Sequence, residues 1–154
     1  MEQKSEVTAS DVAKYIIAEL QEWEDLVTNM RVQHLLYFTQ GWYLHIYGAP
    51  LFAEDLQAWV QGAVQPEVYD EYKEYQWRPI LKEVKYPKLE PHIKKHIEEV
   101  LESYCPETVY NLSFMVRTAQ PWLEARGDLP KDAACTNVIS VETMKNCFAD
   151  FYRA

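Results

Sequence analysis

Residues 28–75 read TNMRVQHLLYFTQGWYLHIYGAPLFAEDLQAWVQGAVQPEVYDEYKEY, and this stretch decides the fold. It opens at Thr28, a residue type that caps helix N-termini, and continues with apolar residues at helical spacing. Gly48 and Pro50 then stop the helix, because glycine adopts the left-handed conformation at low cost and proline cannot continue a helix. Pro66 suits the first turn of a second helix. The stretch therefore predicts two helices that flank a short non-helical segment.

The first of these helices is apolar on nearly all sides between Leu35 and Tyr47, which predicts that it is the central and most buried helix. Gly41 lies inside it at a cost of about 1 kcal/mol relative to alanine. Such a glycine indicates that the backbone of another segment approaches the helix closely. Helical spacing assigns five residues of the stretch to the core: Leu35, Leu36, Tyr43, Ile46 and Tyr72.

Between the two helices, Leu56, Ala58 and Val60 alternate with polar or aromatic residues. Period-two alternation predicts a strand with one solvated face, and it points Trp59 away from Ala58. A two-stranded ribbon is marginal alone, so we expect it to pack on the helices. The following residues, 62–66, are expected to turn into the second helix, and residues 137–139 are expected to form a brief strand.

Helix signals also mark the flanks of the stretch. Thr8 and Asp11 have capping-box spacing, which places a helix start near Ser10. A clean amphipathic stripe follows Pro91. Four further features are expected: a shorter helix capped by Thr108, its interruption at Pro121 and Trp122, a last helix capped by Ser140, and the inward residues Met144, Phe148, Phe151 and Tyr152 of that helix.

These patterns predict a mainly α fold: a single compact helical domain over residues 1–154, with about six to seven helices and a small two-stranded β element. Residues 1–8 are expected to be disordered. A length of 154 residues suits one domain, and 48% hydrophobic with 25% charged residues is ordinary for a globular protein.

The formal net charge of −9 argues against direct binding of nucleic acid, because phosphate would be repelled. The three cysteines lack C-x-x-C spacing and are odd in number, which favours a reducing compartment. The N-terminus has no apolar signal segment, and no run of about 18 apolar residues occurs. We therefore expect a cytoplasmic protein with no membrane contact.

The chemistry-bearing residues offer one zinc-like spacing. His92 and His96 lie four residues apart on one helix face, and Glu99 or Cys105 could add a ligand. However, Lys94 and its neighbour Lys95 lie between the histidines, and ammonium groups beside a dication are unfavourable. No nucleophile or phosphate-loop motif occurs either. The sequence thus predicts no metal, no cofactor and no enzymatic activity.

Trp59 and Trp122 are the aromatic residues least explained by a helical stripe, and each lies beside a turn. One interpretation is a buried structural anchor. The other is a binding hot spot, since tryptophan, tyrosine and arginine are enriched at the centres of protein interfaces. Both interpretations remain open from the residues alone.

The order of several short motifs resembles the Panacea domain family, the SocA-like and phage-associated GepA-type proteins. Similar segments are Arg31 to Tyr47, Ala49-Pro50-Leu51-Phe52, Gln57-Ala58-Trp59, Gly62-Ala63-Val64, Pro66-Glu67-Val68-Tyr69, Leu112-Ser113, Pro121-Trp122 and Ile139-Ser140 through Phe148. Residues 12–17 look like the opening helix of the family. The chain departs from the pattern at Ala63, where the family usually has proline, and at Val116-Arg117, where it usually has Thr-His.

The resemblance implies a mainly helical, non-catalytic antitoxin that binds and neutralises a cognate toxin, encoded by an adjacent gene of a toxin–antitoxin pair. SocA itself delivers its toxin to a ClpXP-type protease, so a proteolysis adaptor with a host protease as partner is the alternative. A phage or prophage protein that modulates host defence is a further alternative. Family motif and turn position together nominate four partner-binding residues: Trp59, Tyr69, Arg117 and Trp122.

Overall fold

The computed structural model describes residues 6–153, with side chains described as far as residue 151. In these residues the chain forms α1 (Ala9–Glu22), α2 (Asn29–Tyr47), β1 (Gln57–Trp59), β2 (Gly62–Val64), α3 (Pro66–Tyr72), a 3-10 turn (Lys73–Tyr75), α4 (Pro91–Tyr104), α5 (Val109–Arg117), α6 (Gln120–Arg126) and α7 (Val141–Arg153). The predicted mainly α fold with a two-stranded sheet is confirmed. Most of the segment expected to be disordered, residues 1–5, lies outside the described residues.

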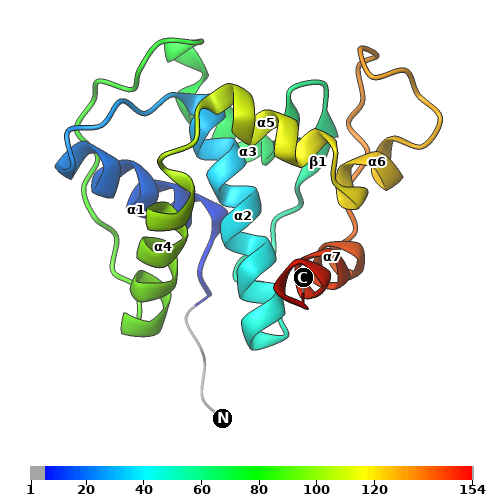
Figure 1. The fold of residues 1–154 in the computed structure, drawn as a ribbon. Helices are drawn as coiled ribbons and strands as arrows, with labels where there is room; N and C mark the ends of the chain where they lie inside the picture. The colour runs from blue at the N-terminus through cyan, green and yellow to red at the C-terminus, as the bar shows by residue number, and fades with distance from the viewer. Residues whose placement is uncertain (1–5, 154) are drawn as a thin grey trace.

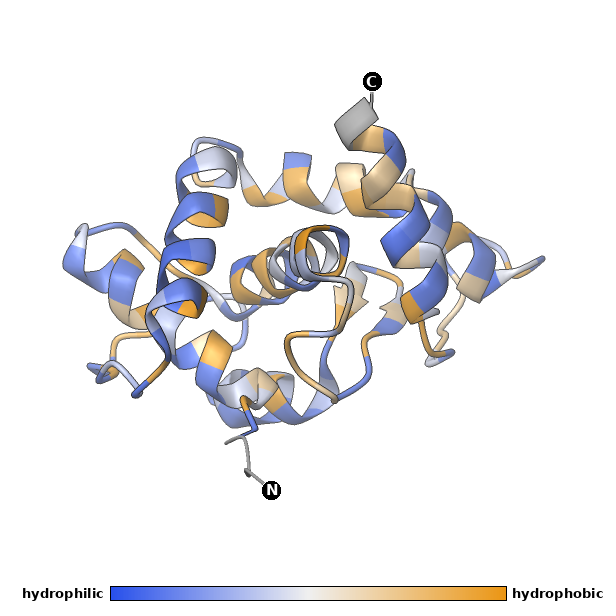
Figure 2. Ribbon diagram, turned by 90° about the horizontal axis from the view of Figure 1, so that it is seen from below, coloured by the Kyte–Doolittle hydropathy of each residue, from blue (hydrophilic) through white to orange (hydrophobic). Residues whose placement is uncertain are grey.

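Helix α2 is the centre of the molecule, as its sequence predicts. Seen nearly end-on, it lies in the middle of the other elements (Figure 2), and thirteen of its nineteen residues are buried. The core prediction fails in its last turns. Ile46 is 57% exposed and Tyr43 is only half-buried, because Leu44 occupies the inward side of these turns and is buried there.

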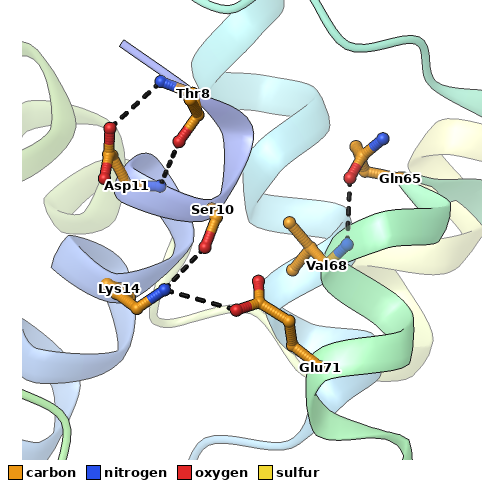
Figure 3. Close-up of polar contacts among 7 residues, drawn as sticks. All are labelled: Thr8, Ser10, Asp11, Lys14, Gln65, Val68 and Glu71. Atoms are coloured by element: carbon orange, nitrogen blue, oxygen red, sulfur yellow. Dashed lines mark hydrogen bonds and ion pairs between the residues drawn. The ribbon is translucent and has the colours of Figure 1, made fainter.

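The capping box predicted for Thr8 and Asp11 is confirmed, and Figure 3 shows it beside the start of α3. Thr8 N donates to Asp11 Oδ2 at 3.2 Å and Asp11 N donates to Thr8 Oγ1 at 3.0 Å, which completes a capping box. At the start of α3, Val68 N donates to the side chain of Gln65 at 3.0 Å. A salt bridge of 3.3 Å between Lys14 Nζ and Glu71 joins α1 to α3.

The sheet consists of β1 and β2 in antiparallel pairing, with Trp59 opposite Gly62. The expectation of a plain turn at 62–66 is therefore wrong for residues 62–64, which pair as a strand. On the other edge of β1, Ile139 N donates to Leu56 O at 2.8 Å and Val138 forms a bridge with Gln57. The extended segment at 137–139 is thus confirmed.

Two expectations about the C-terminal third are wrong. Pro121 does not break a helix but lies in the first turn of α6, where a proline costs no helical hydrogen bond. In α7, Met144 and Phe148 are buried as predicted, whereas Phe151 is 55% exposed. The side chain of Tyr152 lies outside the described residues.

Candidate functional site

The β hairpin brings two of the four nominated residues into contact. The rings of Trp59 and Tyr69 meet edge to face, with centroids 5.0 Å apart. Trp59 Nε1 donates to Gln57 Oε1 at 2.8 Å, which fixes the indole on its strand. Both rings are half-buried, so part of each remains in contact with solvent.

Helix α5 presents an aromatic face next to this hairpin. Thr108 caps the helix, and its inner side buries Leu112 and Val116. At helical spacing on the other side lie Tyr110, which is 73% exposed, and Phe114, which is 53% exposed. A monomer has no packing reason to expose two large rings side by side on one helix.

Arg117 joins the aromatic face of α5 to the hairpin. Its Nε donates to Ser113 Oγ at 3.0 Å, and Ser113 Oγ donates to the carbonyl of Gln61 in the hairpin turn at 2.6 Å. The turn and the helix face are therefore held side by side. We call the combined feature the hairpin–α5 surface, formed by Trp59, Val60, Tyr69, Tyr110, Phe114 and Arg117.

The fourth nominated residue, Trp122, lies beneath this surface and not on it. Its side chain is 1% exposed, and its Nε1 donates to Trp59 O at 2.8 Å. A ring so deeply buried has no face left for a partner. Of the two interpretations given above, Trp122 therefore fits the buried structural anchor. Its hydrogen bond to Trp59 O positions the hairpin from beneath the surface.

Arg126 is a structural residue of the site that the sequence did not reveal. Although it is charged, it is 3% exposed and lies over the Trp122 ring, 4.7 Å from its centroid. It donates to the carbonyls of Ala58 at 3.0 Å, Pro130 at 2.7 Å and Ala133 at 2.6 Å. It thus ties β1 to the loop after α6. The i, i+4 spacing of Trp122 and Arg126 could have predicted their contact, because residues four apart on a helix are neighbours.

His34 of α2 supports the hairpin from below. It is 1% exposed, and a Cβ on Gly62 would lie 2.9 Å from its Cε1, so only glycine fits opposite it without displacement. Burial, and then the charge of Arg117, lower the pKa of His34 to about 4. Its Nδ1 is buried without a hydrogen-bond partner among the described residues. His34 is therefore neutral at pH 7.

The two histidines with zinc-like spacing have different surroundings. His96 is buried, its Nε2 lies 2.9 Å from Thr39 O, and its pKa is lowered, chiefly by burial. His92 is exposed, with its Nε2 3.2 Å from Tyr43 Oη. Across residues 6–153 no group of three or more His, Cys, Asp or Glu residues is placed to hold a metal ion. Nor is any helix of this part long and apolar enough to cross a membrane.

The described chain is thus a small, mainly helical protein with two exposed aromatic side chains on α5. The family model for the antitoxin SocA-like Panacea domain matches residues 32–123, which is more than half of the chain. The protein belongs to this family. The matched region runs from α2 into α6 and includes the whole hairpin–α5 surface. No curated protein and no solved structure matches the chain.

Proposed function

We propose that this protein is an antitoxin that binds a cognate toxin directly and neutralises it through the hairpin–α5 surface. Family membership supports the antitoxin role. The observation that carries the choice of surface is the exposure of Tyr110 and Phe114 beside Arg117 on a helix whose other side is fully packed. Tyrosine and arginine are the residue types that most often dominate binding energy at interfaces.

The negative net charge of the chain supports a positively charged partner protein. A net charge of −9 attracts a positively charged protein and accelerates their encounter, because complementary potentials steer association. Toxins that act on RNA or nucleotides need positive charge to meet phosphate. We therefore expect the partner to be a basic toxin, encoded beside this protein.

Co-expression with the product of the adjacent reading frame tests this proposal. That product alone is expected to stop growth, and co-expression is expected to restore growth and to yield a complex that survives gel filtration. A harmless neighbour, or one that remains toxic in the presence of this protein, would overturn the proposal.

The half-life of the toxin separates neutralisation from delivery to a protease. Sequestration leaves the toxin level unchanged or higher after translation is blocked. An adaptor for a ClpXP-type protease instead shortens the half-life, and does so only in cells that contain the protease. The second result would replace direct neutralisation by the adaptor alternative.

A further inference from the structure

A second exposed apolar feature lies at the end of α1, away from the hairpin. There, residues 25–27 and residues 79–86 of the connector between the 3-10 turn and α4 enclose a groove of about 650 Å³. Val27 and Ile80 are buried at this groove, whereas Leu26 is 68% exposed and Leu81 is 83% exposed. In Figure 1 the connector and α1 lie on the left, and the hairpin and α6 lie on the right. We call this feature the connector groove.

The wall of the connector groove is held in place although it has no regular secondary structure. Gln21 Nε2 donates to Lys82 O at 2.9 Å, and Val84 N donates to Gln21 Oε1 at 3.0 Å. Ile80 N donates to the carbonyl of Val27 at 2.8 Å. The groove therefore exists before a ligand arrives, and binding does not have to order the connector.

Carboxylates outnumber cations in the connector groove. Glu22, Asp25 and Glu83 line it, with Lys85 as the one cation among its lining residues. Asp25 pairs with Arg31 at 3.2 Å. The side-chain carboxylates of Glu22 and Glu83, by contrast, make no hydrogen bond or ion pair within the part of the chain described by the structure.

The hydroxyl group of Tyr86, another residue that lines the groove, is also surrounded by carboxylates. Its hydroxyl donates to Glu19 Oε1 at 2.8 Å. Burial raises the pKa of Tyr86 to about 12, with further contributions from the hydrogen bond to Glu19 and from the charges of Glu19, Glu22 and Glu98. Three carboxylates thus act on Tyr86, one of the residues that line the groove.

We propose that the connector groove is a docking site for a short segment of a partner protein that carries lysine or arginine beside large apolar side chains. The apolar side chains would cover Leu26 and Leu81, and the cations would pair with Glu22 and Glu83. A second copy of this chain is a poor occupant, because each copy carries −9. This inference goes beyond the antitoxin role and does not depend on it.

A synthetic peptide tests the docking site without any toxin. The probe is a fluorescein-labelled peptide of alternating leucine and lysine, and its comparator has glutamate in place of lysine. Fluorescence anisotropy is expected to show binding of the first peptide and none of the second. The double variant E22Q/E83Q is expected to weaken binding about fivefold, because it removes two partly exposed ion pairs.

Two matched variants distinguish the groove from the general negative charge. Asp132→Asn combined with Glu142→Gln removes the same charge at exposed positions outside the groove, and should change the Kd less than twofold. Leu81→Ser should weaken binding without loss of stability, since its side chain is 83% exposed.

Equal loss in the control variant, or equal binding of both peptides, would overturn the proposal. Dimerisation of the unmodified protein that Leu81→Ser abolishes would assign the groove to a second copy and would overturn it as well. Failure of the peptide assay leaves the antitoxin proposal intact, because growth rescue by co-expression is measured separately.

Discussion

The ring of Phe148 occupies the space that a side chain at Gly41 would fill. A Cβ built on Gly41 would overlap three carbon atoms of that ring. The same ring packs against Tyr37 and Trp42 of α2, with centroid distances of 5.6 Å and 5.1 Å. The glycine therefore permits close approach of a ring, not of the backbone that its position in the helix suggested.

Gly41→Ala is expected to destabilise the protein by about 1–3 kcal/mol, because overpacking forces the ring or α7 to move. The higher helix propensity of alanine offsets only about 1 kcal/mol of this strain. Urea denaturation measures the change. Phe148→Leu should make the added methyl group less costly, so the double mutant should lose less than the sum of the single mutants. An additive double mutant would show that Gly41 and Phe148 are not coupled.

Arg126→Met is expected to destabilise the protein by about 2–4 kcal/mol, since hydrogen bonds from a buried charged donor are worth more than neutral ones. The carbonyl of Ala58 loses a donor, and the loop at 127–137 loses two tethers. Hydrogen exchange should accelerate in that loop. Arg78→Met is the control: Arg78 is exposed and makes one 3.4 Å hydrogen bond, so its removal should change stability little.

Stability is expected to fall on acidification between pH 6.5 and about 4 because of His34. Its folded-state pKa is lowered to about 4 from the ordinary value of 6.5. Above pH 6.5 the ring is neutral in both states, so its contribution is fully present. As the pH falls below 6.5, the imidazole of His34 binds a proton in the unfolded chain but stays neutral in the folded protein. This difference favours unfolding by up to about 3 kcal/mol.

Urea denaturation at several pH values measures this dependence. His34→Gln should flatten the curve between pH 4 and 6.5 relative to the unmodified protein, whatever its effect at pH 7. An identical slope in the unmodified protein and the His34 variant would mean that other groups cause the acid sensitivity.

Replacement of Tyr110 and Phe114 by serine is expected to abolish toxin neutralisation while stability stays within about 0.5 kcal/mol, because both rings are largely exposed. Trp59→Ala should weaken binding as well, with some loss of stability, since half of that ring packs in the protein. Growth rescue and gel filtration measure the first effect, and urea denaturation the second.

The control for this surface is the exposed end of α2. Ile46→Ser combined with Tyr47→Ser removes two exposed apolar side chains that lie outside the hairpin–α5 surface. That variant should neutralise the toxin as the unmodified protein does. Equal loss in both double variants would mean that the toxin binds elsewhere or contacts both regions.

Local signals predicted the helices well because caps and stops act within one turn. Thr28 and Gly48 bound α2 as expected, with Thr28 accepting from Arg31 N and Gly48 in the left-handed conformation. The strand at 62–64 was missed because its pairing depends on β1, a nonlocal contact, and glycine at its start indicates a turn. Pro121 was read as a breaker because proline stops one helix and starts the next with the same geometry.

The sequence predicted the region in which the four nominated site residues lie. It did not predict which of their side chains are buried and which are exposed. Trp59 and Trp122 look alike in sequence, each beside a turn, yet one ring is half exposed and the other is buried. The exposure of Tyr110 and Phe114 could not be predicted from the sequence either. Helix α5 carries apolar residues on both sides, and only tertiary packing decides which side is covered.

The packing around α2 is completed only by the last helix of the chain, α7. Phe148 and the rest of α7 cover Gly41, Tyr37 and Trp42, about a hundred residues earlier in the chain. During translation, Tyr37 and Trp42 cannot gain their contacts with Phe148 until α7 has left the ribosome. A nascent chain stalled before residue 141 therefore offers chaperones and proteases an uncovered apolar helix, and only synthesis through α7 removes it.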